Sequence, residues 1–172
     1  MKFLPLLLVP ALVAAQDITI ANVQYSGNGC PQGTVSTSIS SDKTQIHLTL
    51  SYPAGYSFAV IDSTYHGYAQ LEAGVTGTFY SQYYFSSDAS KTCTTQSSIA
   101  GGGVWADGQV YTKEDVVPSP NYVKSKCGTT EILNVNNRVA LTSTNSNASG
   151  QLTDDDATVD VSQQVHIKWF TC

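Results

Sequence analysis

The chain has 172 residues, of which 8 are basic and 13 acidic, so its formal net charge is −5 at pH 7. This balance excludes nucleic acid and the membrane surface as expected partners, because phosphates and anionic lipids attract clustered Lys and Arg. Charged residues make up only 12% of the chain, against about 25% in an average globular domain, and Ser, Thr, Asn, Gln and Gly replace them.

The first residues have the layout of a secretory signal peptide. Lys2 is followed by an apolar run over residues 3–15 that ends in small side chains. The run holds two prolines and is shorter than the roughly 20 residues that span a bilayer, so a membrane helix is the weaker interpretation. We predict cleavage after Ala15, which leaves residues 16–172 as a single secreted β domain with a net charge of −6.

Apolar and polar residues alternate with a period of two along the mature chain, and no segment shows a sustained helical period. The alternation predicts half-buried strands at residues 45–50, 133–141 and 159–169. The apolar run 58–61 predicts a strand that is covered on both faces. The irregular segment 97–126 predicts long loops around one or two edge strands. Short strands joined by Gly- and Pro-rich turns predict an all-β fold, a single-domain antiparallel β-sandwich, with a barrel as the weaker alternative.

Four cysteines, all in the mature part, predict two disulfides, because an even number of cysteines in an oxidising compartment favours pairing. No two of them have the spacing of metal ligands. Of the three connectivities that four cysteines allow, we favour Cys127–Cys172 together with Cys30–Cys93. The first pair closes a loop that chain-entropy models value at about 4 kcal/mol, and it would fasten the C-terminus.

Five stretches of the mature chain carry a resemblance to a known family. They are YSGNGCPQGTV (25–35), YHGYAQLEAGVTGTFYSQYYF (65–85), KCG (126–128), EILNVNNRVALTSTNSNASGQL (131–152) and WFTC (169–172). They resemble the small secreted proteins of filamentous fungi that form the family of domain of unknown function 4360. The resemblance implies secretion from a fungus and a compact, disulfide-linked β fold. It implies no established enzymatic activity and supplies no catalytic residues.

The chain departs from this family at one point. Members of the family carry a further region after the second strand, which ends in an Arg-Lys-Asn-Cys-type motif. Here Leu50 runs almost directly into Tyr52, and that region is absent together with its cysteine. Either Cys93 replaces the missing cysteine as the partner of Cys30, or the chain is a shortened or divergent gene product.

Tyrosines are concentrated in the centre of the chain, with seven of the ten between Tyr52 and Tyr84. Exposed aromatic rings can stack on sugar rings, whereas tyrosines also occupy strands for packing reasons. Tyr80, Tyr83 and Tyr84 do not all share one strand face, which argues against a platform built from that run alone. The candidate ligand-binding residues are therefore Tyr52, Tyr56, Tyr65, His66 and Tyr68.

Two polar segments near the C-terminal end are further candidate sites. The run Asp154-Asp155-Asp156 lacks the alternate spacing of calcium-binding loops, so we expect a solvated hairpin tip, no metal and no cofactor. Asn147 opens the sequon Asn147-Ala148-Ser149 and is a predicted glycosylation site.

No group of residues predicts an enzyme. The Gly-x-Ser-x-Gly, His-Glu-x-x-His and phosphate-loop motifs do not occur, and a mature N-terminus other than His excludes an oxygenase with a histidine brace. Asp62 and Glu72 flank the aromatic region and keep a small hydrolase of cell-wall polysaccharide as the alternative. We predict no catalytic residues and a non-catalytic, effector-like or wall-binding secreted protein, whose partner is a cell-wall polysaccharide or a host protein.

Overall fold

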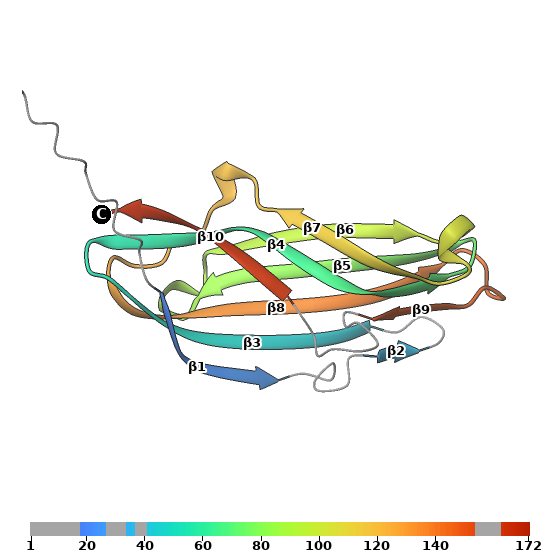
Figure 1. Ribbon diagram of the computed structural model, residues 1–172, viewed down its shortest axis with the longest axis horizontal. Helices are drawn as coiled ribbons and strands as arrows, with labels where there is room; N and C mark the ends of the chain where they lie inside the picture. Colours follow the sequence, from blue (N-terminus) through green and yellow to red (C-terminus); the bar gives the residue numbers. More distant parts are fainter. Residues whose placement is uncertain (1–17, 27–33, 37–40, 154–162) are drawn as a thin grey trace, which may run out of the picture.

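The structure is a computed structural model that describes residues 18–26, 34–36, 41–153 and 163–172, and the structural statements below refer to these residues. They form ten strands and three short 3-10 turns, and all of the strand pairs are antiparallel. The strands make two sheets that face each other, with sheet B in front of sheet A in Figure 1. The prediction of an all-β fold is therefore confirmed.

Sheet A has the strand order β1-β3-β8-β5-β6. Its strands are β1 (Thr19–Ser26), β3 (Ser41–Tyr52), β5 (Val75–Phe85), β6 (Thr92–Ala100) and β8 (Thr129–Ser143). The central strand β8 pairs with β3 on one side and β5 on the other. The central strand of this sheet is therefore paired on both sides with strands from earlier, distant parts of the sequence.

Sheet B is built around the long strand β4, which pairs with β10 and β9 and also with β7. Its strands are β2 (Thr34–Ser36), β4 (Tyr56–Leu71), β7 (Gln109–Val116), β9 (Gly150–Thr153) and β10 (Gln163–Thr171). The 3-10 turns η1 (Ser86–Asp88), η2 (Gly103–Trp105) and η3 (Ser119–Asn121) lie in connections between strands.

A β-bulge in β4 changes which of its residues face the interior. Its register with β10 shifts after His166, so that Ile167 pairs with Val60 while His166 pairs with Asp62. One extra residue reverses the alternation of a strand. Even-numbered Phe58 and Val60 are therefore buried before the bulge, and odd-numbered residues from Ser63 to Leu71 are buried after it.

Two apolar clusters fill the space between the sheets. The first consists of Tyr65, Ala69, Leu71, Val75, Phe79, Ile99, Tyr111, Val139, Leu141 and Leu152. The second consists of Leu50, Tyr52, Phe58, Val60, Tyr83, Phe85, Cys93, Val117, Leu133 and Val135. Each cluster draws side chains from both sheets, so burial of apolar surface holds the two sheets together.

Buried polar groups form a layer between the two clusters. Ser81 pairs in register with Asn137, and its hydroxyl donates to Asn137 Oδ1 at 2.8 Å. The hydroxyl of Tyr65, which comes from sheet B, contacts Ser81 and lies 3.0 Å from the hydroxyl of Tyr83. Burial raises the pKa of the Tyr65 phenol above its usual range. These hydrogen bonds connect the two sheets at a fixed register, because a buried hydroxyl without a partner is costly.

The cysteines agree with only one of the two predicted disulfides. Cys127 and Cys172 are bonded, with their Cα atoms 6.0 Å apart. Cys93 carries a free thiol, so the predicted Cys30–Cys93 pair is wrong in this structure. The side chains of β6 alternate between the two faces of the sheet, and this alternation places Cys93 in the second apolar cluster at 4% exposure. Its burial raises the pKa of the thiol to about 11. Cys30 lies outside the described residues.

Candidate functional site: the outer face of sheet A

The outer face of sheet A carries two tyrosines that lie on the same side of β5. Phe79, Ser81 and Tyr83 are buried in the interior, so Tyr80, Gln82 and Tyr84 point away from it and are half-buried. Four residues of extended strand separate the two tyrosines by about 13 Å. They are thus the ends of a short aromatic–amide–aromatic track along β5.

Neighbouring strands surround this track with polar side chains that contain few charges. In register, β8 places Asn134 beside Tyr84, Asn136 beside Gln82, and Arg138 beside Tyr80. The next strand on each side continues these rows. We call the resulting surface the amide face and define it by ten residues: Gln45, His47, Tyr80, Gln82, Tyr84, Thr94, Gln96, Asn134, Asn136 and Arg138.

Hydrogen bonds fix part of the amide face. The buried amide of Asn134 donates to Ser86 Oγ at 2.8 Å and to the Tyr84 carbonyl at 3.3 Å. Its Oδ1 accepts a hydrogen bond from His47 Nδ1 at 2.5 Å. One row of the face is therefore held in place across β3, β8 and β5, which reduces the side-chain entropy that a ligand would have to remove.

The charge of the amide face differs from that of the whole protein. Among the outward-facing side chains that the structure describes on sheet A, Arg138 is the only charged one. It is exposed, and its guanidinium carbon lies 5.3 Å from the centre of the Tyr80 ring, where a cation–π contact orients it. The thirteen acidic residues of the chain contribute no described carboxylate to this face.

The amide face has the chemistry to hold a polyhydroxylated ligand. Each Asn and Gln side chain offers both hydrogen-bond donors and an acceptor, which matches a sugar hydroxyl that also does both. The tyrosine rings offer flat apolar surface and a hydroxyl. Because no described side chain of this face is a carboxylate, the face favours a ligand that is neutral or negatively charged.

The residues predicted as a ligand-binding cleft do not share one surface. Tyr52 and Tyr65 are buried in different apolar clusters, and the Tyr52 hydroxyl donates to the Lys126 carbonyl at 2.8 Å. Tyr56 is half-buried, with its ring 6.3 Å from that of Trp169. Only His66 and Tyr68 lie together on an open surface, the outer face of sheet B.

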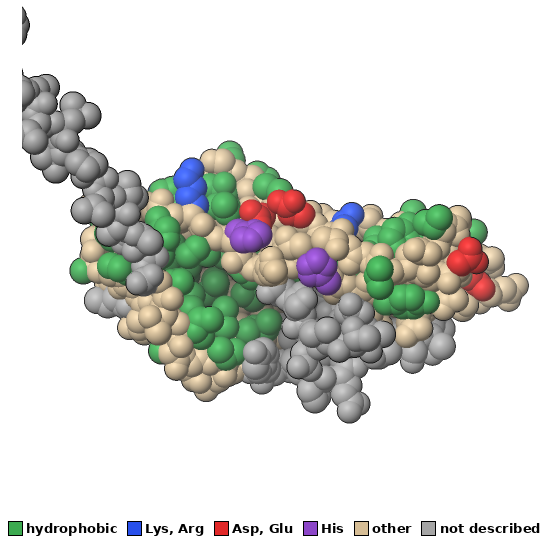
Figure 2. All heavy atoms as spheres, viewed as in Figure 1, with side chains coloured by type: hydrophobic (Ala, Val, Ile, Leu, Met, Phe, Trp, Pro, Cys, Tyr) green, Lys and Arg blue, Asp and Glu red, His purple; other side chains and the backbone are tan. Residues whose placement is uncertain are grey.

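The outer face of sheet B is more highly charged than the amide face. Asp62 accepts a hydrogen bond from the ring of His166, and His66 Nδ1 is 2.9 Å from the hydroxyl of Thr112. Figure 2 shows histidine and acidic side chains in the middle of the visible surface, with apolar side chains toward both ends. Tyr68 packs against Gly108, where any Cβ would overlap its hydroxyl.

The two carboxylates considered for hydrolysis lie far apart. Asp62 is near the middle of β4, and Glu72 follows its last residue. Nine further residues of strand separate them by roughly 30 Å, whereas glycosidase carboxylates are about 5–10 Å apart. Glu72 instead accepts a hydrogen bond from the Ser149 backbone at 2.8 Å and supports a turn.

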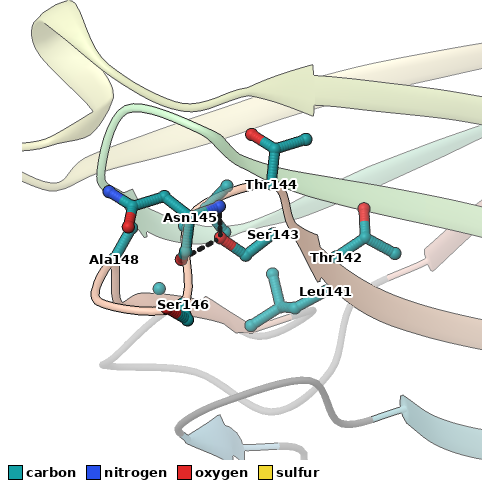
Figure 3. A pocket seen from close by; sticks show the side chains of 9 residues that line it. Leu141, Thr142, Ser143, Thr144, Asn145, Ser146 and Ala148 are labelled. Atoms are coloured by element: carbon teal, nitrogen blue, oxygen red, sulfur yellow. Dashed lines mark hydrogen bonds between the residues drawn. The ribbon is translucent and has the colours of Figure 1, made fainter.

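A separate pocket of about 410 Å³ lies at the turn between β8 and β9 (Figure 3). Within that turn, Ser143 Oγ donates to the Asn145 carbonyl at 2.7 Å and accepts from its backbone nitrogen at 3.1 Å. Asn147 is exposed in the same turn, so its glycosylation stays a prediction. Residues 154–156 lie outside the described part. The pocket is lined by Val75, Leu141, Thr142, Ser143, Thr144, Asn145, Ser146, Ala148 and Gly150.

The architecture and the amide face define a disulfide-bonded, all-β protein with a polar, nearly uncharged sheet face. The chain belongs to the family of Domain of unknown function (DUF4360), whose profile matches residues 16–51 and 44–172. The two matches overlap at residues 44–51. In the structure a short turn at residues 53–55 joins β3 to β4 directly after this overlap.

A relative in the fungus Arthroderma benhamiae supports the same assignment. It is described as an uncharacterized secreted protein and is 35% identical over 181 residues, which cover 90% of this chain and 72% of the relative. The protein is thus a secreted member of the family. No helix in the described residues is long and apolar enough to cross a membrane.

Solved structures give only distant similarities. TmCBM61 in complex with β-1,4-galactotriose has a TM-score of 0.26 and 9% identity, covering 88% of this chain and 90% of that one. An agarase, AgWH50C, has a TM-score of 0.21 and 7% identity, covering 73% of this chain and 23% of the agarase. At these TM-scores neither likeness supports a conclusion about fold or ligand.

Proposed function

We propose that this protein is a non-catalytic secreted binding protein that holds a cell-wall polysaccharide on its amide face, with residues 16–172 acting as one β-sandwich domain. The observation that carries the proposal is the composition of that face. Two tyrosines on one side of β5 are surrounded by amides and hydroxyls from four strands, without a described carboxylate. A polysaccharide offers the complementary chemistry, with apolar ring faces and many hydroxyls.

A protein partner fits the amide face less well. The core of a protein–protein interface is depleted in charged residues and enriched in large apolar and aromatic side chains. The amide face presents amides where such a core would lie. The most exposed large apolar residues that the structure describes, Val104, Val110 and Val116, lie outside sheet A, and the two on sheet A, Ile20 and Ile132, are not among the ten residues of the amide face. A sugar chain therefore suits the surface better than an apolar protein patch.

The geometry also supports a binding role over hydrolysis. The amide face has no described carboxylate that could act as an acid or base, and Asp62 and Glu72 are too far apart to act on one glycosidic bond. The polar groups of the amide face can bind and orient a sugar chain. They lack the pair of carboxyl groups that hydrolysis requires.

The test is a pull-down of the oxidised mature protein on insoluble chitin, β-glucan, cellulose and mannan, with release of reducing sugar followed in the same tubes. We expect retention on at least one polymer without sugar release. Release of sugar by the purified protein would show that it is a hydrolase. A protein that stays in the supernatant with every polymer would refute polysaccharide binding and direct the search to protein partners.

Matched variants locate the binding surface. We expect Tyr84→Ala and Gln82→Ala to weaken retention, because both side chains belong to the amide face. Tyr68→Ala removes a half-exposed tyrosine from the opposite sheet and should leave retention unchanged. The reverse result would transfer the site to the outer face of sheet B, which carries His66 and Tyr68, two of the candidate residues named from the sequence.

A further inference from the structure

We infer that the amide face binds an acidic polysaccharide, one whose sugars carry carboxylates, and that Arg138 is the residue that binds a carboxylate. The inference rests on the proposed function and names the substrate class of the same site. Its starting point is a single exposed cation at the centre of a face with otherwise neutral described side chains.

The described neighbours of Arg138 leave its hydrogen-bond donors available to a ligand. Along β8 its neighbours on the same face are Asn136 and Ala140, and across β5 it lies beside Tyr80. None of these carries a negative charge, and no ion pair joins Arg138 to a carboxylate in the described part of the chain. The guanidinium is planar and presents its donors in a fork that fits a carboxylate with two parallel hydrogen bonds.

The contact with Tyr80 keeps the guanidinium in a defined position. Its carbon lies 5.3 Å from the ring centre, so the ring supports one face of the cation, while no described residue accepts a hydrogen bond from the donors along its edge. A preoriented cation loses less side-chain entropy when it binds an anion. Tyr80 then supports Arg138, and Tyr84 remains as the ring for sugar stacking.

The experiment compares two forms of one polymer, polygalacturonate and its methyl ester, which share a backbone and differ in charge. We expect the native protein to bind polygalacturonate about tenfold more tightly in affinity electrophoresis or calorimetry at pH 7, a difference typical of one charged bidentate contact. Arg138→Gln should abolish the preference. Arg138→Lys, which keeps the charge and loses the fork, should retain part of it.

The control is Lys168→Gln, which removes the same charge from an exposed residue of β10 in the opposite sheet. It should bind both polymers as the native protein does. Equal binding of the two forms, or a preference that survives Arg138→Gln, would overturn the inference. Retention on the neutral polymers of the panel would then leave the proposed function intact, whereas no binding to any polymer would refute both.

Discussion

The Cys127–Cys172 disulfide closes a loop of 45 residues that contains β8, β9 and β10. We predict that the double variant Cys127→Ala/Cys172→Ala unfolds more easily by about 4 kcal/mol, the loop-closure entropy of a chain of that length. For a domain of this size the melting temperature should fall by about 8–16 °C. The native fold itself should persist, because its contacts around the bridge do not depend on sulfur.

Those contacts are two backbone hydrogen bonds beside the disulfide. Cys172 donates its N–H to the Gly55 carbonyl at 2.9 Å, and Gly128 donates to the Tyr56 carbonyl at 2.8 Å. Both hold their ends of the loop against the β3–β4 turn. The variant therefore keeps its folded-state hydrogen bonds, and the loss of stability arises mainly in the unfolded chain, which gains conformational freedom.

Urea unfolding followed by tryptophan fluorescence and circular dichroism measures the difference. Reductant should lower the stability of the native protein to that of the double variant and should leave the variant unchanged. A loss below about 1 kcal/mol would refute the loop-entropy reasoning. Sensitivity of the double variant to reductant would reveal a second disulfide and contradict the free thiol at Cys93.

Three further predictions concern the interior. Tyr65→Phe should cost about 1–3 kcal/mol in urea unfolding, because it removes the hydroxyl that joins Ser81 and Tyr83 in the polar layer; Tyr68→Phe, at a half-exposed site, is the control, and equal effects would contradict the role of the layer. Gly67→Ala should unfold the protein or block its secretion, since a Cβ there would overlap the Thr153 carbonyl and lie 2.5 Å from the Tyr111 hydroxyl; Thr64→Ala on the same strand should be tolerated, and a stable Gly67→Ala protein would show that this close approach is wrong. The folded state raises the pKa of Cys93 from 9.0 to about 11, so it favours the protonated thiol, and the associated stability is present below pH 9 and lost as the pH rises from 9 to 11. The free energy of unfolding should decline over that range less steeply in Cys93→Ala than in the native protein, and identical slopes would show that the thiol is not buried.

Local patterns in the sequence predicted four of the long strands: the alternation indicated β3, β8 and β10, and the apolar run indicated β4. The apolar run at 58–61 is buried in the centre of sheet B, with Phe58, Ala59 and Val60 at 0–2% exposure. The irregular stretch at 97–126 contains the end of β6 and the whole of β7, which agrees with the prediction of one or two edge strands in this segment. Local patterns succeed here because each strand needs one apolar face, whichever strand lies beside it.

Local sequence patterns do not predict which distant strands pair. The even number of cysteines suggested a bond between Cys93 and Cys30, whereas the alternation of side chains along β6 places the Cys93 thiol in the core. The bulge opposite His166 reverses the inward face of β4, so Tyr56 and Tyr65 both point inward although one is even-numbered and the other odd. An uninterrupted alternation would have placed them on opposite faces, and no turn residue in the sequence marks the extra residue.

The candidate site was missed for a related reason. Tyr80 and Tyr84 share a face, but the other face of β5 is aromatic as well, with Phe79, Tyr83 and Phe85. The sequence of the strand therefore does not say which of the two faces is covered. The packing of sheet B against Phe79 and Tyr83 decides it. The amides that complete the face come from β8, about fifty residues later in the chain, and reach Tyr84 only through the β5–β8 register. A binding surface made from the open faces of several strands therefore becomes visible only when the strand order is known, whereas a site within one loop could have been read from its motif.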